Sequence, residues 1–538
     1  MPDTTTRQAT AGLRSGLQLV QNATSGFLVF LIALPLCLGI ASASGFPAVA
    51  GVLTAIVGGV IASFVGSAPL TVKGPAAGLI VIALGAVTEL GGGNPALGYQ
   101  KALAVGVVAG AIQIVLALTR AGVVATIMPP AVVHGMLAAI GVIIIAKQTP
   151  VALGAASKGG EPLEMLADIP HYIMGANPIV AAVGLLALFT LITMNLASRF
   201  AIVKRVPAPL VVLLLTVPLG AVFHFSQPHD YSMLGQTFSI GPKNLVQLPG
   251  SLLSAVTLPD FSSITSAVSI KYIIMFALVG SVESLLSVLA VDAMDPQKRA
   301  SNLDKDLLAV GVGNLIASCI GGLPMISEIV RSKANMDAGA TNRFSNFFHG
   351  VFLLLFVALL PGLLQMIPLA ALAAMLLFTG YRLASPKEFL HMWHVGKDQF
   401  VVFFTTFAVT LATDLLVGVG VGILLKLALH AFRAGGARGL LANRPAVVRD
   451  GEVLRVTITG PAVFSTLIPL RKALSALPEG VSTVELDLRG ATLVDFTFQE
   501  KLAGIADEWT NARLKVVGLD QMKAASDHPF AARTRAAA

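Results

Sequence analysis

Two stretches of this sequence place charge, glycine and proline inside apolar surroundings. Residues 321–340, GGLPMISEIVRSKANMDAGA, carry Glu328, Arg331 and Lys333 within six residues, and residues 68–82 read APLTVKGPAAGLIVI. Each stretch has a glycine or a proline where a helix would begin. A half-helix that begins inside a membrane leaves its first N–H groups unbonded, and these donors attract an anion together with the positive end of the helix dipole. The pattern therefore predicts a small-anion site that needs no metal.

The residue types indicate how such a site would be built. An anion would approach the backbone closely on one side and would meet amide groups and positive potential on the other. The residues expected there are Gly74, Pro75 and Ala77 on the first side, and Ser327, Glu328 and Arg331 on the second. A simpler interpretation puts Arg331 and Lys333 at the cytoplasmic end of a short span, where basic residues are common.

A further carboxylate, Glu283, lies in the middle of the apolar segment 270–291, with Ser287 one helical turn later. An ionised side chain at the bilayer centre costs about 2.5–3.5 kcal/mol, so such a residue is rare without a function. Three interpretations stay open. In the first, Glu283 is a structural acid bonded to a neighbouring helix. In the second it is a proton or sodium site, and in the third it is a charge that shapes anion entry.

The composition explains why these charges stand out. The chain has 538 residues, of which 55% are hydrophobic and only 12% are charged, whereas soluble proteins carry about a quarter charged residues. We divide it into a polar N-terminal segment (1–21), a transmembrane transport domain (22–433), a linker (434–450) and a C-terminal domain (451–538). The N-terminal segment lacks the pattern of a signal peptide. The two cysteines, Cys37 and Cys319, offer neither a disulfide framework nor a Cys/His metal cluster.

Apolar segments of roughly 20 residues cross a bilayer, and we count fourteen candidates. Three of them, 71–89, 306–321 and 323–338, are short or interrupted. The others are 26–43, 47–65, 99–119, 122–146, 178–197, 207–225, 270–291, 346–365, 367–383, 399–413 and 415–432. With this count, basic residues gather in the loops on one side, which predicts cytoplasmic termini. The interrupted segments are then the third and tenth spans, in corresponding positions of two inverted halves of seven, which is where transporters bind their substrate.

The C-terminal domain has a different pattern. Segments 452–459, 482–488 and 514–520 alternate as strands do, and helical stretches near 465–477 and 497–512 lie between or beside them. Strands that alternate with helices predict a small α/β domain.

The sequence resembles the sulfate permease (SulP) family of inorganic anion transporters across nearly its whole length. The residues that carry the resemblance are FLIALPLCLGIASASG in the first span, LTVKGPAAGLIVI in the third, VESLLSVLAVD in the eighth, and GVGNLIASCIGGLP followed by IVRSKANMDAGA in the ninth and tenth. The tail resembles a STAS domain at LRGATLVDFTFQEKL. The resemblance implies an all-α membrane domain of fourteen spans in a seven-plus-seven inverted repeat with core and gate subdomains, a substrate between the third and tenth spans, and a dimer.

Residues carried over from the family agree with those chosen from the pattern. Ala76 and Ala77 match the binding position of the third span, and the eighth span supplies an acidic position at Glu283 and a polar one at Ser287. Ser327, Glu328 and Ile329 match the start of the tenth-span half-helix, followed by a recurring Arg-Ser pair at Arg331 and Ser332.

Two positions depart from the family pattern. Ala77 replaces the threonine of some cyanobacterial bicarbonate transporters, which argues against a sodium site built on that residue. In STAS domains that act as phosphorylation switches a serine follows the loop aspartate closely, whereas Asp495 is followed here by Phe496 and Thr497. Asp495 and Thr497 are therefore the candidate regulatory residues.

The resulting prediction is a secondary active transporter of a small inorganic oxyanion in a bacterial inner membrane, working by elevator-like alternating access. The motifs are most similar to the bacterial branch often encoded beside carbonic anhydrases, which favours bicarbonate, with sulfate next. Coupling to Na⁺ or H⁺ near Glu283 is expected, with no other cofactor, no metal and no catalytic residue. Expected partners are the lipid bilayer, a second copy of the chain and a cytoplasmic regulator at the STAS domain, but no nucleic acid. The alternatives are a dicarboxylate or nucleobase carrier of the same fold, an anion channel, and a membrane-anchored signalling protein.

Overall fold

A computed structural model describes residues 4–122, 128–157, 160–200, 203, 206–233, 235–247, 253–434, 436, 440, 445–474, 477–478, 480–507, 509 and 512–535. Residues 123–127 of the predicted span 122–146 lie outside this set, as do parts of the predicted linker 434–450 and of the C-terminal domain. The chain forms two compact units. One contains residues 1–122 and 140–383, and the other contains residues 123–139 and 384–538.

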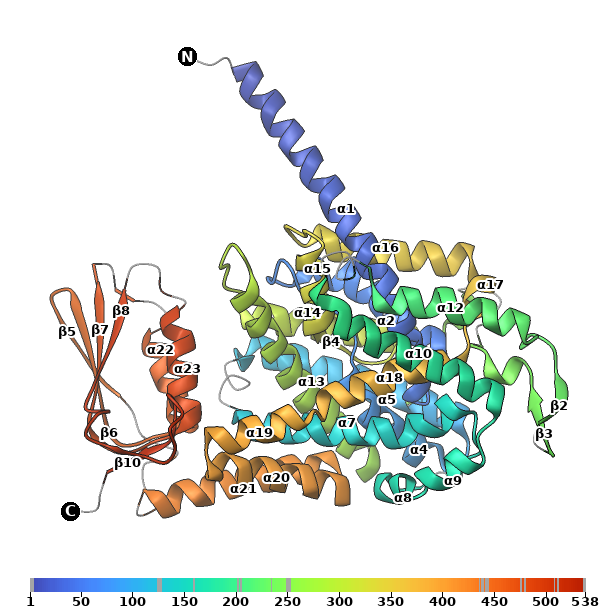
Figure 1. Cartoon of the computed structure of the whole chain (residues 1–538). Coiled ribbons are helices and arrows are strands. Elements are labelled where there is room, and N and C mark those ends of the chain that lie inside the picture. Colours follow the sequence, from blue (N-terminus) through green and yellow to red (C-terminus); the bar gives the residue numbers. More distant parts are fainter. Residues whose placement is uncertain are drawn as a thin grey trace. The chain divides into compact units, whose positions relative to one another are not determined.

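The first unit is a helical membrane bundle, as predicted (Figure 1). Among the described residues of the whole chain, eight helices are long and apolar enough to cross a membrane: Leu17–Ala43, Ala48–Val65, Pro95–Leu118, Pro130–Leu153, Pro178–Arg199, Ala267–Asp292, Leu369–Val395 and Leu415–Arg433. Three shorter apolar helices are Ala77–Gly91, Ala208–Val222 and Phe344–Leu359. Helices α14 (Leu303–Cys319), α15 (Ile329–Asp337) and α20 (Lys397–Ala412) lie at three further predicted spans. The count of fourteen and the inverted repeat stay predictions.

Local sequence explains where several of these helices begin. Asn94 accepts hydrogen bonds from the amides of Ala96 and Leu97 at the start of α5 (Pro95–Leu118), and Pro95 occupies the first turn, where its missing N–H is not needed. In the same way Asn302 accepts from the amide of Lys305 at the start of α14. The helices then pack through a core that includes side chains of α1 (Thr4–Ala43), α2 (Ala48–Val57), α10 (Pro178–Leu196), α16 (Phe344–Leu359) and α18 (Leu369–Leu383).

Both interrupted segments contain a short strand followed by a helix. Strand β1 (Val72–Pro75) precedes the 3₁₀ turn η2 (Ala77–Leu79) and α4 (Ile80–Gly91), and β4 (Met325–Glu328) runs directly into α15. The two strands pair antiparallel in the register Val72↔Glu328, Lys73↔Ser327, Gly74↔Ile326 and Pro75↔Met325. Segments about 250 residues apart in the sequence therefore meet as one two-stranded sheet inside the bundle.

The second unit contains α19 (Pro386–Val395), α20 and α21 (Leu415–Arg433) together with a C-terminal sheet domain. The sheet order is β5-β6-β7-β10-β9, and β8 pairs with β7. Strands β6 (Val453–Ala462), β7 (Thr483–Val494) and β8 (Arg513–Val517) are parallel neighbours and overlap the three predicted strands, although β7 continues past the predicted end at 488. Helices α22 (Leu467–Leu474) and α23 (Phe496–Asp507) lie on one face of this sheet (Figure 1).

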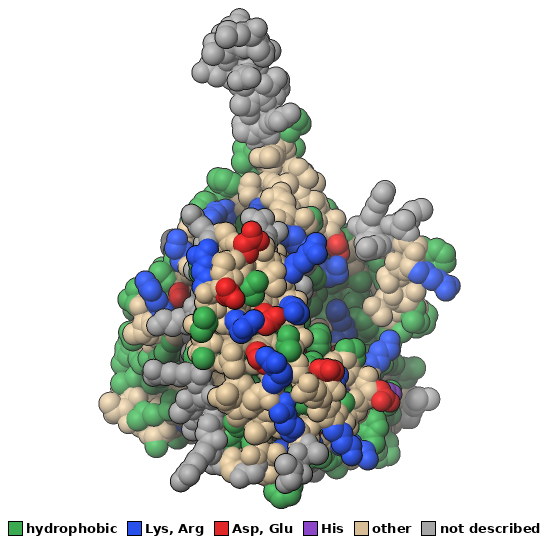
Figure 2. All heavy atoms as spheres, turned by 90° about the vertical axis from the view of Figure 1, so that its left-hand side faces the viewer, with side chains coloured by type: hydrophobic (Ala, Val, Ile, Leu, Met, Phe, Trp, Pro, Cys, Tyr) green, Lys and Arg blue, Asp and Glu red, His purple; other side chains and the backbone are tan. Residues whose placement is uncertain are grey.

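The sheet domain differs from the prediction at its edges. Its first strand, β5 (Ala446–Asp450), lies inside the predicted linker, and two short strands, β9 (Lys523–Ala524) and β10 (Arg533–Thr534), lie near the C-terminal end. Figure 2 shows a face on which Lys and Arg are interspersed with Asp and Glu. Two of the exposed pairs are Arg455 with Glu485 and Lys515 with the same carboxylate, at 3.1 and 2.9 Å. A face of mixed charge of this kind suits contact with water.

Candidate functional site

Strand β1 is fixed to the start of α15 by side chains of that helix. The Val72 amide donates to Ser332 Oγ at 2.8 Å, and the same hydroxyl donates to the carbonyl oxygen of Glu328 at 2.5 Å. One turn later, Asn335 Nδ2 donates to the carbonyl oxygen of Leu70 at 3.1 Å. These bonds satisfy backbone groups that a strand inside a helical membrane bundle would otherwise leave unpaired.

Strand β4 is fixed from the opposite direction by α13 (Ala267–Met294) and α14. Asn314 on α14 accepts from the Met325 amide at 2.6 Å and donates to the Met325 carbonyl at 3.2 Å, so its amide group acts like a neighbouring strand. Gln113 Oε1 accepts from the same Asn314 Nδ2 at 2.8 Å. Ser284 Oγ on α13 accepts from the Ser327 amide at 3.0 Å.

Arg331 reaches across the strand pair and does not lie at an exposed end of its helix. Its residue exposure is 1%, Nη2 donates to the carbonyl oxygen of Pro75 at 2.8 Å, and Nη1 lies 3.4 Å from Cys37 Sγ. A Cβ at Gly74 would be 2.6 Å from Nη1, so a larger residue there would displace the end of the guanidinium. The simpler interpretation, a basic residue at the end of a span, accounts less well for these buried contacts of Arg331. It suits Lys333, which is exposed and pairs with Asp337 at 3.7 Å.

Glu283 points its carboxylate at the start of the other half-helix. A Cβ at Gly78 would overlap both carboxylate oxygens, so the acid packs directly against the backbone of η2. Ser287, the other predicted coupling residue, donates its hydroxyl proton to the Glu283 carbonyl at 2.8 Å. Its oxygen lone pairs are left as acceptors.

Four buried polar atoms of the predicted substrate and coupling residues have no hydrogen-bond partner among the residues that the structure describes. They are Glu283 Oε2, Ser327 Oγ, Glu328 Oε1 and Arg331 Nε. Buried polar groups in native proteins are nearly always bonded to protein, water or a ligand, and exceptions gather at functional sites. The four come from α13, β4 and α15, the elements that meet at the sheet.

A cavity of about 460 Å³ lies against one side of this cluster. Ala77, Glu328 and Arg331 form part of its wall, and apolar side chains such as Leu36 of α1 and Met375 of α18 form another part. The remaining predicted binding residues are not part of its lining: Gly74 and Pro75 lie within β1, Ala76 directly before η2, Ser327 within β4, and Ile329 at the first position of α15.

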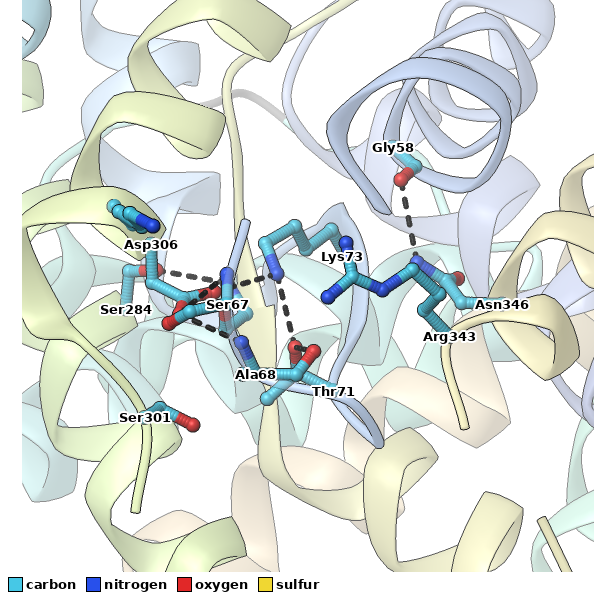
Figure 3. A network of polar contacts seen from close by, with 12 residues as sticks. Gly58, Ser67, Ala68, Thr71, Lys73, Ser284, Ser301, Asp306, Arg343 and Asn346 are labelled. Carbon is cyan, nitrogen blue, oxygen red and sulfur yellow. Dashed lines mark hydrogen bonds and ion pairs between the residues drawn. The ribbon is translucent and has the colours of Figure 1, made fainter. Parts of the chain in front are cut away.

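An ion pair that the sequence did not indicate lies beside the site (Figure 3). Lys73 Nζ, at 1% exposure, lies 3.0 Å from Asp306 Oδ1 and donates to Thr71 Oγ1 at 2.9 Å. The other carboxylate oxygen of Asp306 accepts from the backbone amides of Ser67 and Ala68 at 3.1 and 2.8 Å. One feature of the sequence points to such a pair: Lys73 lies within a membrane-buried stretch, and a buried charge needs a partner. The partner, 233 residues away, had no such signal.

The candidate regulatory residues of the second unit are both fully buried. Asp495 Oδ1 accepts from the Phe498 amide at 2.7 Å, and Oδ2 lies 3.6 Å from Lys426 Nζ and 3.3 Å from His430 Nε2 of α21. Burial alone would raise the pKa of Asp495, but the Lys426 ammonium and the His430 ring hold this pKa below its usual range. The Thr497 hydroxyl has no hydrogen-bond partner among the described residues. A kinase could not reach it without local opening of the domain.

These features define a multi-pass membrane protein whose paired strand–helix elements surround a cluster of unsatisfied polar groups. The model of the sulfate permease family matches residues 19–406, more than half of the chain, and the chain belongs to this family. Proteins of this family are transporters of small inorganic anions, not enzymes.

Individual relatives are distant but cover most of the chain. YvdB of Bacillus subtilis is 25% identical over 92% of this chain and 90% of its own length. The bicarbonate transporter BicA of Picosynechococcus is 26% identical over 74% of this chain and 68% of its own.

Solved structures share the fold. The transmembrane domain of a cyanobacterial BicA has a TM-score of 0.62 at 24% identity, covering 76% of this chain and 97% of that one. The murine Slc26a9 anion transporter has a TM-score of 0.66 at 15% identity, with coverages of 92% and 85%.

Proposed function

We propose that this protein is a secondary active transporter of a small inorganic oxyanion, with bicarbonate favoured over sulfate. The observation that carries the proposal is the cluster of four unsatisfied polar atoms at the β1–β4 pair, next to a cavity lined by Ala77, Glu328 and Arg331. The sulfate permease family and its bicarbonate-transporting relatives support the substrate class. The remaining predicted site residues, Gly74, Pro75, Ala76, Ser327 and Ile329, belong to the same proposed site.

Two kinds of positive potential would hold the anion. The helices that follow β1 and β4 begin at Ala77 and Ile329, where the first amides are free of helical partners and the dipole is positive. The Arg331 guanidinium adds a full charge whose Nε donor is unsatisfied among the described residues. The buried location makes each of these interactions stronger than it would be in water.

Glu283 is proposed as the coupling residue. A carboxylate buried in a membrane domain is expensive unless it binds a proton or a cation, and this one lies against the start of the half-helix after β1. Proton or Na⁺ binding at Glu283, with Ser287 Oγ as a further ligand, would link cation movement to anion occupancy of the adjoining site.

At the level of the whole chain, the proposal includes fourteen spans in an inverted repeat over residues 22–433, with a core that moves against a gate. It also includes a linker at 434–450 and a cytoplasmic STAS domain at 451–538 that serves dimerisation or a regulator. The protein would be a homodimer in a bacterial inner membrane with both termini in the cytoplasm. The six-stranded sheet covered by α22 and α23 supports the STAS part of the proposal.

The test is uptake of labelled bicarbonate and labelled sulfate into proteoliposomes, with and without imposed Na⁺ and pH gradients. We expect gradient-dependent bicarbonate uptake by the wild type, and loss of the gradient dependence in Glu283→Gln. Glu89→Gln is the matched control, because Glu89 is a half-exposed acid of α4 that pairs with Lys271 at 3.3 Å. Uptake of neither anion by the wild type would overturn the proposed function. Gradient-dependent uptake that survives in Glu283→Gln would overturn only the coupling role.

A dicarboxylate carrier of the same fold is the second candidate, and the size of the cavity is the observation that supports it. A volume of about 460 Å³ with largely apolar walls has room for a longer organic anion than either inorganic substrate. Competition of labelled bicarbonate uptake by succinate would separate the two, since a dicarboxylate carrier is inhibited by succinate more strongly than by sulfate.

A further inference from the structure

Glu328 is an unexpected residue at a site for anions. It lies at the last position of β4, directly before α15, and it lines the cavity together with Arg331 and Ala77. Its carbonyl oxygen is occupied by Ser332, but its side-chain Oε1 is buried and has no hydrogen-bond partner among the described residues. A carboxylate in this place repels an anion, and the repulsion is larger in a buried site than in water.

The chemistry of the wall indicates which anion overcomes that repulsion. An ionised carboxylate only accepts hydrogen bonds, whereas a guanidinium only donates them. An oxyanion that retains a hydroxyl hydrogen offers both: its deprotonated oxygens accept from Arg331 and from the amides, and its O–H donates to Glu328. A fully deprotonated oxyanion has nothing to donate and leaves Glu328 both unsatisfied and facing like charge.

We propose that Glu328 is the specificity-determining residue of the site and selects monovalent oxyanions that carry a hydroxyl hydrogen, such as bicarbonate, over oxyanions that carry none. The inference rests on the proposed transport function and deepens it, because it names the feature of the substrate that is recognised. Arg331 and Glu328 act together as one donor and one acceptor on the same wall.

Other charged groups near the strand pair do not line the cavity. Lys73 and Asp306 neutralise each other at 3.0 Å, and the Glu283 carboxylate packs against Gly78. Of the charged side chains in the described part of the chain, the cavity wall carries Glu328, Arg331 and Arg382. Arg382 belongs to the last turn of α18 and is a second cation of the wall, so Glu328 is its acidic acceptor.

Nitrate is the probe that isolates the hydroxyl. Nitrate matches bicarbonate in its single charge and planar shape but has no hydrogen, while sulfate differs in charge as well. We would measure labelled bicarbonate uptake into proteoliposomes, and its inhibition by nitrate and by sulfate, for the wild type, Glu328→Gln, Glu328→Asp and the control Glu89→Gln. The glutamine variant keeps the size of the side chain, removes its charge and adds a donor.

We expect the wild type to prefer bicarbonate to nitrate, and we expect Glu328→Gln to reduce this preference by about tenfold or more, the effect of one hydrogen bond to a charged group. Inhibition by sulfate should strengthen in the same variant, while Glu328→Asp and Glu89→Gln keep the wild-type order. Bicarbonate uptake with an unchanged order in Glu328→Gln would overturn this inference and leave the proposed transport function intact. So would a wild type that prefers nitrate or sulfate. A wild type that takes up no anion would overturn both.

Discussion

Gly74 and Arg331 fit together because one of them has no side chain. The guanidinium passes the strand where Gly74 leaves space, and it reaches the Pro75 carbonyl at 2.8 Å. The backbone of β1 is therefore in direct contact with the guanidinium of the candidate site. Gly74 looks like a helix breaker in the sequence, but in the structure it lets the Arg331 guanidinium approach the backbone of β1 closely.

Gly74→Ala should displace Arg331, since the new Cβ would be 2.6 Å from Nη1. A displaced guanidinium no longer points at the proposed position of the anion. We therefore expect the maximal uptake rate to fall by about tenfold to a hundredfold, which is the effect of a small misplacement of a functional group. Gly420→Ala in α21 is the control, because nothing lies within 4 Å of its added Cβ. Unchanged uptake in Gly74→Ala would mean that transport does not depend on this exact position of the guanidinium.

Residues whose type stands out from their neighbours in the sequence were predictable without the structure. Arg331 and Glu283 are charges in apolar surroundings, and their cost in a membrane identifies them without a structure. The Lys73–Asp306 pair was not predictable, because Asp306 lies near the first turn of α14, where an acidic residue has an ordinary explanation at the positive end of the dipole. The role of Asn314 depends in the same way on where Met325 lies in three dimensions.

At the scale of elements, helix α14 holds both strands of the pair. Asp306 near its first turn binds Lys73 of β1 and the amides of Ser67 and Ala68, and Asn314, two turns later, binds Met325 of β4. The sequence predicts two interrupted segments, but their register depends on these long-range contacts. Helix α14 therefore contacts both of the strands that precede α4 and α15.

Asp306→Asn should destabilise this arrangement, since it leaves the Lys73 ammonium buried without a countercharge. Removing one partner of a buried pair costs about 3–5 kcal/mol, whereas replacing both by apolar residues is often neutral. Thermal unfolding of the detergent-solubilised protein should show a large loss in the single variant and recovery in Lys73→Met/Asp306→Asn, whose side-chain oxygen can still accept from the amides of Ser67 and Ala68. Lys271→Met, which removes a half-exposed cation paired with Glu89, is the control and should change stability little. Equal stability of the single and double variants would contradict the pairing.

At the scale of the whole molecule, the second unit joins its last membrane helix to the sheet domain through buried polar contacts. Lys426 and His430 of α21 face Asp495 at the β7–α23 junction, and Lys426 Nζ also donates to Gln399 Oε1 of α20 at 2.9 Å. Leu427 of α21 packs on the apolar core of the sheet domain. The sequence predicts a separate α/β domain after a linker. It does not show this attachment, because Lys426 and Asp495 are 69 residues apart and meet only in the folded chain.

Asp495→Asn should loosen the attachment of the sheet domain to α21, since Lys426 is left buried beside a neutral amide. The Asp495 pKa is below its usual range in the folded protein, so its ion pair stabilises the fold above the unfolded pKa of about 3.9 and loses that effect as the pH falls through the folded value. Unfolding of the full chain should therefore separate wild type from variant by about 3–5 kcal/mol at pH 7, with the difference shrinking only below about pH 4. Limited proteolysis at pH 7 should release the sheet domain faster from Asp495→Asn than from Lys515→Met, which removes an exposed cation 2.9 Å from Glu485. Equal release rates would mean that the apolar contacts around Leu427 hold the domain by themselves.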